Sequence, residues 1–431
     1  MLLSHKEYDI IKRLLQDAKR QKTQLSLVVE KDQVKKVSLE HDTLSHAETG
    51  TPLSVLLKLR TQGTGTQGKE AILKSNTLDL SLVQKAVAIA RALPSKETAP
   101  FPPAQPKKYL ALRPDRKLFD VQSDTLVEDA QQIIEILKEK KIIASAGGVT
   151  AVAETRLVAS TSGVWHEDTM AQYGIWASAV SASKKSTYSE SDSKMHLFSP
   201  QHITEFILDK VVQFEHTSSL AKVPNFRKLP IVFVPSTVSG LLQNAFIENL
   251  NAESVDKKKS LFVGKLGERM LGNITIIDDG RRKEGVKTSG CDDEGNPRST
   301  TSLVKRGVVA RFITDAYQAQ RQKLPMTGNG SLFGPDFTNL VVESFGSLPE
   351  KAIIIDNIIG AHTSNSLTTD FSVKVENGYA LLGKTIIPLK PFMVSGKMLE
   401  FLRNAIAAGK DIEERDGVYT GSVAGFCSLV P

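Results

Sequence analysis

Apolar positions along the first 215 residues recur at two spacings, one typical of helices and one typical of strands. A helix is predicted from Ser4 to about Lys22, with an apolar face made of Tyr8, Ile11, Leu14, Leu15 and Ala18. Segments 25–30 and 34–40 then read as strands on either side of a short hairpin turn at 31–33. The pattern continues with predicted strands at 53–60 and 70–75, joined by the glycine-rich segment 61–68, helices at 79–92 and from Asp124, strands at 142–154, 156–160 and 171–183, and a helix at 200–214.

Two proline-containing segments divide this pattern. The first, at about 94–114, carries six prolines and cannot be regular helix, so we predict an extended crossover within the first domain. The second, at 222–228, precedes a new apolar run. It is predicted to mark the boundary between an N-terminal domain (1–225) and a C-terminal domain (226–431).

The second half begins with a predicted strand at 231–234 and a predicted helix at 236–254. It continues as many short β runs separated by Gly, Asn and Pro, without the repeated strand–helix–strand units of a parallel sheet. We therefore predict an α+β fold, with a mixed α/β sheet domain first and a strand-rich, largely antiparallel domain second.

Composition indicates a soluble cytoplasmic protein. Hydrophobic residues make up 40% of the 431 positions, and no apolar run approaches the roughly 18–20 residues that a membrane span requires. The start of the chain lacks the apolar centre of a signal peptide. Cys291 and Cys427 are the two cysteines, too few for a disulfide framework, which fits a reducing compartment.

The net charge of +7 raises the question of an acidic partner such as nucleic acid. The basic residues are dispersed among acids, with small clusters at 257–259 and 281–283. Aromatic residues make up only 6% of the chain and do not interleave with these clusters, as single-strand binding surfaces require. The pattern therefore argues against direct nucleic-acid binding.

The segment Cys291–Pro297 contains three consecutive acids, Asp292, Asp293 and Glu294, followed by Gly295. Three carboxylates could hold a hard cation, but the ligand spacing of a calcium loop is absent. A hydrogen-bonded or solvated turn is the favoured interpretation. Asn329 lies between two glycines, where a hairpin turn is favoured over a phosphate-binding loop because no Gly-Lys-Ser/Thr follows.

Six segments in fixed order carry a family resemblance: 260–268, 278–280, 292–295, 327–330, 369–372 and 394–396. Together they resemble the TldD/PmbA family, long called modulators of DNA gyrase. The resemblance is strong from about 230 to 425 and weaker but collinear before that. Asp292, Asp293, Glu294, Gly295, Asn329, His362 and Asp370 are the family-type positions, predicted to be structural or to line a chamber.

The catalytic branch of this family carries His-Glu-x-x-x-His on the helix after the first strand of the second domain. Two imidazoles and a later cysteine hold zinc there, and the glutamate deprotonates zinc-bound water. Gln243, Asn244 and Glu248 occupy the corresponding positions here, and no histidine occurs between His216 and His362. The sequence therefore resembles the zinc-less PmbA/TldE branch, which implies no catalytic residues and no metal ligands in this chain.

Two other histidine patterns are weaker candidates for a metal site. His41 and His46 have zincin-like spacing in turn-like sequence, and we interpret them as a surface loop. His166-Glu167 begins like a zinc-binding helix, but Met170 stands where a second histidine is needed, so a strand end is favoured.

The resemblance implies a non-catalytic subunit that pairs with a TldD-like zinc metallopeptidase subunit and forms part of a closed chamber for unfolded or extended peptides. Zinc is then expected in the partner, and no cofactor in this chain. One alternative is an independent hydrolase built around His362, Asp370 and Cys427. Another is a protein that binds gyrase or nucleic acid. For the chain alone, a homodimer is the alternative assembly.

Overall fold

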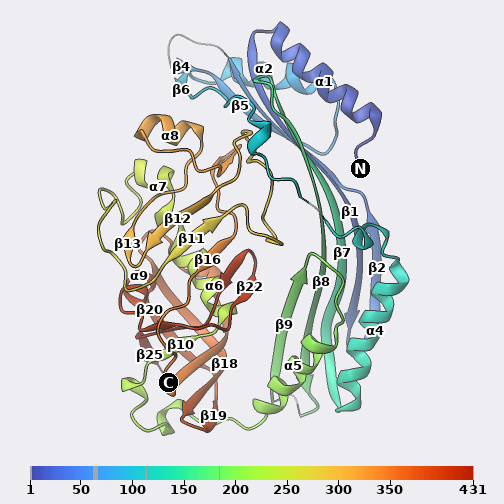
Figure 1. Cartoon of the computed structure of the whole chain (residues 1–431). Coiled ribbons are helices and arrows are strands. Elements are labelled where there is room, and N and C mark those ends of the chain that lie inside the picture. The colour runs from blue at the N-terminus through green and yellow to red at the C-terminus, as the bar shows by residue number, and fades with distance from the viewer. Residues whose placement is uncertain (1, 62–66, 113, 184, 431) are drawn as a thin grey trace.

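A strongly curved seven-stranded antiparallel sheet forms one side of the molecule in the computed structural model, which describes residues 2–61, 67–112, 114–183 and 185–430 (Figure 1). The strand order is β5-β3-β1-β7-β8-β9, and β2 also pairs with β1. The bounds are β1 (Thr23–Glu40), β2 (Thr43–Gly50), β3 (Leu53–Thr61), β5 (Glu70–Ser75), β7 (Ile142–Ser160), β8 (Trp165–Ser181) and β9 (Thr187–Lys194). Short strands β4 (Gln67–Gly68) and β6 (Lys96–Glu97) pair separately.

Helices cover one face of this sheet. They are α1 (His5–Arg20), α2 (Leu82–Ala92), α3 (Lys117–Asp120), α4 (Ser123–Glu139) and α5 (Gln201–Gln213). Alternate strand residues such as Leu25, Leu27 and Leu57 are fully buried beneath α1 and α2, as period-two patterning requires. Ser4 begins α1 with a reciprocal capping box to Glu7, an arrangement that stabilises a helix end by about 1 kcal/mol. The predicted helix at Ser4 is confirmed.

The hairpin predicted at 31–33 is wrong, because β1 runs unbroken through these residues. Its first half pairs with β3 (Thr23 with Thr61, through Lys31 with Leu53), and its second half pairs with β2. Its other edge pairs with β7 along almost its whole length, so the backbone at 31–33 stays in a ladder. The hairpin lies at His41 and Asp42, which have φ of 48° and 59°, and His46 lies on the exposed strand β2.

The strands predicted at 142–154 and 156–160 are likewise one strand, β7, with Thr155 buried within it. The pair predicted at 53–60 and 70–75 is confirmed as β3 and β5, while residues 62–66 of the predicted connection lie outside the described residues. Of the described part of the proline-rich segment, only β6 and the 3-10 turn Pro106–Lys108 are regular. Its extended course fits the predicted crossover.

The remaining sheets are built from residues after 230. An eight-stranded sheet has the order β21-β24-β10-β17-β18-β20-β25, with β19 beside β18, and a six-stranded sheet has the order β13-β12-β11-β16-β23-β22. Most pairs are antiparallel, with β10–β17 and β16–β23 parallel. The α+β class is confirmed.

The first of these sheets contains β10 (Ile231–Phe233), β17 (Lys351–Ile359), β18 (Asp370–Leu382), β19 (Thr385–Leu389), β20 (Phe392–Lys397), β21 (Ala407–Ala408), β24 (Val423–Gly425) and β25 (Ser428–Val430). The second contains β11 (Ile276–Asp279), β12 (Thr300–Lys305), β13 (Val308–Val309), β16 (Leu340–Val342), β22 (Glu413–Arg415) and β23 (Val418–Thr420), and a separate hairpin pairs β14 (Gly330–Ser331) with β15 (Gly334–Pro335). One core, which includes Phe233, Phe246, Phe262 and Phe401, fills the space between these elements.

The helix predicted at 236–254 is broken into three parts. These are α6 (Pro235–Ala245), a 3-10 turn (Ile247–Leu250) and α7 (Ala252–Asp256). The break comes after Ala245, where Phe246 leaves helical geometry with φ of −144°, and Asn251 starts α7 by accepting a hydrogen bond from the amide of Glu253. The other helices of this half are α8 (Ala316–Gln322) and α9 (Met398–Arg403). Within the described residues, no helix combines the length and apolar character that a membrane crossing needs.

Candidate functional site

The acidic turn at 292–295 lies where the C-terminal half meets the helix-free face of the large sheet (Figure 1). Val28 and Val158 of that face pack against Cys291 and Leu332. The acidic residues therefore do not form a solvated loop. They are enclosed by strands from one side and by β14 from the other.

Asp292 is fully buried, and its carboxylate organises the turn. Oδ1 accepts the backbone N–H groups of Glu294 (3.0 Å) and Asn296 (2.8 Å). Oδ2 accepts the N–H of Gly330 (2.8 Å) and the side-chain amide of Asn296 (3.2 Å). Burial raises the pKa of Asp292 to about 6, and Arg298 and these donors oppose the rise.

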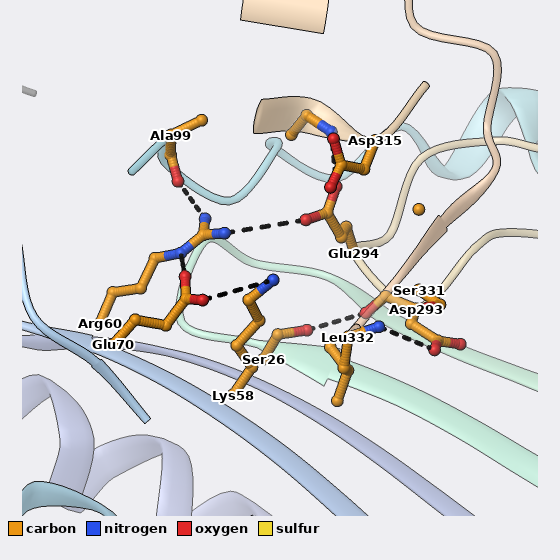
Figure 2. Close-up of polar contacts among 12 residues, drawn as sticks. Ser26, Lys58, Arg60, Glu70, Ala99, Asp293, Glu294, Asp315, Ser331 and Leu332 are labelled. Carbon is orange, nitrogen blue, oxygen red and sulfur yellow. Dashed lines mark hydrogen bonds and ion pairs between the residues drawn. The ribbon is translucent and has the colours of Figure 1, made fainter. Parts of the chain in front are cut away.

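Glu294 is also fully buried and faces a charged cluster on strands β3 and β5 (Figure 2). Its Oε1 lies 3.9 Å from Arg60 Nη2, and its Oε2 accepts the N–H of Ala316 (2.8 Å) at the start of α8. Arg60 Nε donates to Glu70 (2.6 Å), which also lies 3.8 Å from Lys58 Nζ. Burial raises the pKa of Glu294 to about 8, and the nearby carboxylate of Asp292 adds to the rise. The two neighbouring groups therefore resist being ionised at the same time.

Asp293 joins the turn to strands β1 and β7. Its carboxylate forms an ion pair with Arg156 and accepts the N–H of Leu332 (3.2 Å), and its carbonyl accepts Ser26 Oγ (2.9 Å; Figure 2). Arg156 also donates to the carbonyl of Cys291 (3.3 Å). Through Asp293 the turn is thus bonded to both strands at the centre of the sheet.

Gly295 and Asn329 are the other two family-type positions that lie beside the acidic residues. Gly295 has φ of +88°, and a Cβ there would lie 2.4 Å from Val164, so no other residue fits without movement. Asn329 donates from Nδ2 to Asp278 (2.7 Å) and to the carbonyl of Asp336 (2.9 Å). Asn329 lies just before β14, whereas residues 332 and 333 form the turn between β14 and β15, so the hairpin turn predicted at Asn329 is wrong.

These five family-type positions therefore gather into one hydrogen-bonded junction between the two halves. Asp292 accepts four hydrogen bonds and Asp293 pairs with Arg156, whereas Oε1 of Glu294 accepts no hydrogen bond from the described residues and lies 3.9 Å from Arg60. Among the residues that the structure describes, no group of three or more His, Cys, Asp or Glu is arranged to hold a metal ion.

Sequence reasoning missed the cationic half of the junction: Lys58, Arg60 and Arg156. All three are buried, and each lies within a predicted strand or at its end. Lys58 and Arg60 alternate with the buried Leu57 and Leu59, so they point to the face opposite the helices. A signal was present, because charged residues at alternate positions of an otherwise apolar strand indicate a partner on that face.

The helix at the expected zinc position, α6, carries side chains that bond within the chain. Gln243 donates from Nε2 to Ser239 Oγ (3.0 Å), and Asn244 donates from Nδ2 to the carbonyl of Gly240 (2.8 Å). Glu248 lies beyond the end of α6 and accepts a hydrogen bond from Ser254. These amides and this engaged carboxylate do not fit the imidazole and thiolate set of a catalytic zinc site.

A cleft of about 460 Å³ lies between α6 and the large sheet. Ser236, Ser239 and Gly240 of α6 line one wall, and Trp176 and residues 188–191 of β8 and β9 line the other. Polar bridges span the halves here, among them the following pairs. Tyr188 donates to Asp356 (2.7 Å), and Arg415 pairs with Glu190 (3.2 Å).

The structure does not bring His362, Asp370 and Cys427 into the junction. His362 is exposed on a 3-10 turn (Ala361–Thr363) that packs beside Gly240 of α6. Asp370 is exposed and pairs with Lys397 (3.0 Å). Cys427 is partly buried next to Gly396, and burial raises the pKa of its thiol to about 12, which disfavours the thiolate. Among the described residues, no hydrogen bond joins these three side chains.

Comparison with known proteins now identifies the class. Residues 227–425 match the family model of the PmbA/TldA metallopeptidase C-terminal domain. The chain is 30% identical over 369 residues to an uncharacterized protein of Methanocaldococcus jannaschii, covering 83% of this chain and 85% of that protein. This chain belongs to the PmbA/TldD metallopeptidase family.

Solved structures match over the whole length. TldE from Thermococcus kodakarensis superimposes with a TM-score of 0.87 at 20% identity, covering 98% of this chain and 99% of that chain. A candidate modulator of a DNA gyrase from Thermotoga maritima superimposes with a TM-score of 0.88 at 19% identity, covering 98% and 100%. The fold of this chain is therefore the full TldD/TldE-type fold, and the predicted family is confirmed.

Proposed function

We propose that this chain is the non-catalytic, zinc-less subunit of a TldD/TldE-type metallopeptidase complex, and that it forms part of a chamber for unfolded or extended peptides. The proposal rests on the residues that occupy the zinc-ligand and base positions of the family. Gln243, Asn244 and Glu248 replace the ligand and base positions, and all three make hydrogen bonds within the chain. Zinc and the peptidase chemistry would then come from a TldD-like partner subunit.

The cleft beside α6 supports a role in holding peptide. It lies next to β9, an edge strand of the large sheet, and next to β22, an edge strand of the six-stranded sheet. Edge strands offer backbone donors and acceptors to an extended chain without demanding a particular side chain. Such a wall would favour unstructured peptides over folded ones.

The test uses the purified chain alone, a TldD-like subunit alone, and the two mixed. Zinc content is measured by elemental mass spectrometry, the assembly by light scattering, and cleavage with an unfolded fluorogenic polypeptide. We expect no stoichiometric zinc and no cleavage from this chain alone, a two-chain complex on mixing, and cleavage that depends on the partner's zinc. Stoichiometric zinc or peptide cleavage in the lone chain would refute the proposal.

The rival hydrolase would depend on His362, the exposed histidine beside α6. If the lone chain showed turnover, which would refute the subunit proposal, a His362→Ala variant would test whether His362 is responsible for it. Turnover that survives this substitution would eliminate the rival's best-supported residue. Light scattering on the lone chain also tests the alternative that it forms a homodimer.

A further inference from the structure

A second pocket, of about 630 Å³, opens where the proline-rich segment meets loops of the C-terminal half. Among the residues that the structure describes, its lining includes four cationic side chains, Lys107, Lys108, Arg281 and Arg298, and no Asp or Glu. We refer to it as the basic pocket. Neither the proposed partner nor the cleft beside α6 accounts for this concentration of charge.

The charges of Lys107, Lys108 and Arg281 have no ion-pair partner among the described residues, whereas the charge of Arg298 is partly offset by the buried Asp292. Among the described residues, no carboxylate lies within ion-pair distance of any of the four cations. Arg281 donates to the carbonyls of Lys108 (3.1 Å) and Arg298 (3.4 Å), which are neutral acceptors. These bonds hold the guanidinium in place and leave its charge available to a ligand.

Arg298 forms the half-buried base of the basic pocket. It donates to Ser289 Oγ (2.8 Å) and to the carbonyl of Gly328 (2.8 Å), and part of its charge acts on the buried Asp292 behind it. Lys107, Lys108 and Arg281 are exposed around it. The strongest ligand interactions are therefore expected from these three rim cations.

The positive lining is not a general consequence of the net charge of +7. The pocket of about 590 Å³ between β9 and β22 has a mixed lining, in which Lys194 pairs with Asp192 and Arg415 pairs with Glu190 and Glu413. The excess of cations is therefore a property of the basic pocket itself, and it favours an anionic ligand there.

The basic pocket suits a carboxylate better than a nucleic acid. Tyr109 is the one aromatic residue among its lining residues, and its ring lies against His166 (4.6 Å between centroids) while its hydroxyl donates to the carbonyl of Gly295 (2.9 Å). It is therefore not free to stack on a base, as single-strand recognition requires. The cations surround a hollow and do not form a stripe that a phosphate backbone could follow.

We propose that the basic pocket binds the carboxylates of an acidic segment of the peptide substrate. The choice of a peptide rests on the proposed function, and the choice of an acidic one rests on the pocket. Acidic stretches of an unfolded chain would be held at this point while another part of the same chain reaches the cleft.

The test measures binding to the full chain by fluorescence anisotropy. The probes are a labelled octapeptide of alternating Glu and Ser, the same peptide with Gln in place of Glu, and a single-stranded oligothymidylate of matched charge. The pocket variants are Lys107→Gln/Lys108→Gln and Arg281→Gln. The matched control, Lys258→Gln/Lys259→Gln, removes two exposed lysines outside the pocket. Thermal melts establish that each variant is folded.

We expect the acidic peptide to bind more tightly than its Gln counterpart, and less tightly as salt is raised. Each removed rim cation should weaken binding roughly two- to fivefold, as for exposed charge pairs, while the control pair should bind like the parent. Equal weakening in the control and pocket variants would overturn the proposal. So would tighter, pocket-dependent binding of the oligonucleotide, which would favour nucleic acid instead.

Failure here is distinguishable from failure of the proposed function. If the acidic peptide binds no more tightly than its Gln counterpart while the two-chain complex still cleaves peptides through the partner's zinc, only the proposal for the basic pocket is refuted. If the lone chain holds zinc or cleaves peptide, the subunit assignment is lost whatever the binding data show.

Discussion

Replacement of Arg156 by methionine should destabilise the protein strongly, because this arginine is the buried counter-charge of the junction. Its side chain is 7% exposed, and it pairs with Asp293 and lies 3.5 Å from Glu30 and 3.9 Å from Asp168. Removing one partner of a buried ion pair costs roughly 3–5 kcal/mol, because the remaining charge stays buried. Asp293 and Glu30 keep some contact with water, so the lower end, about 3 kcal/mol, is expected.

The measurement is equilibrium unfolding in urea together with calorimetry. For 431 residues at about 2.1 cal/mol/K each, the entropy of unfolding is about 0.9 kcal/mol/K, so this loss corresponds to a fall in Tm of about 3 °C. Adding Asp293→Asn to the variant should recover part of the loss, because the unpaired carboxylate is then neutral.

Arg321→Met is the matched control. Arg321 also has two carboxylate partners, Asp256 (2.8 Å) and Glu97 (2.7 Å), but its side chain is 42% exposed. Its loss should cost far less, because solvent screens exposed pairs. If both methionine variants lose the same stability, burial does not govern the strength of the junction and the reasoning is refuted.

Three further predictions follow from the same geometry. In urea unfolding, Gly295→Ala should lower the free energy of unfolding by about 3 kcal/mol, because it combines a left-handed backbone with a 2.4 Å approach to Val164. Gly163→Ala, with φ of +97° and open space around it, should lower it by only about 1 kcal/mol. Equal losses in the two variants would contradict this reasoning. The folded chain holds a proton on Glu294 up to about pH 8, whereas the unfolded chain releases it near pH 4.5. The free energy of unfolding should therefore fall as pH rises from about 4.5 to about 8, and Glu294→Gln should make it less dependent on pH in this range. Parallel profiles for parent and variant would show that Glu294 is not the titrating group. Treatment with a chelator should leave the Tm of the lone chain unchanged within about 1 °C, since ligand removal lowers Tm only where a bound ligand stabilises the fold; a fall of several degrees would reveal a metal site.

Much of the local structure was predictable because its causes are local. Ser4 and Glu7 cap a helix through neighbours in sequence, and alternation marks β3 and β5. The acidic turn was predicted as a hydrogen-bonded or solvated turn, and it is hydrogen-bonded: Asp292 accepts from Glu294 and Asn296, two and four positions away, in addition to the distant Gly330. Such contacts are encoded within a few residues, so they can be read without the rest of the fold.

The errors have long-range causes. The continuous strand β1 looks like a hairpin in sequence because Lys31, Asp32 and Gln33 are polar, yet β7 pairs with this stretch from more than 100 residues away. The break after Ala245 depends partly on Asn249, whose side chain donates to the carbonyl of Ser366 (2.6 Å). Neither partner is identifiable from the local pattern.

The sequence by itself determined the family, the α+β class and the lack of imidazoles at the position of the zinc helix, because each depends on which residues occupy a short ordered pattern. Only the tertiary structure decided that the acidic turn is a buried junction. Its counter-charges, Arg60 and Arg156, come from strands that are distant in sequence, and charges can pair only after sheet topology has placed them on the same face. The basic pocket has the same origin, because the proline-rich segment and three separate loops meet only in the folded chain.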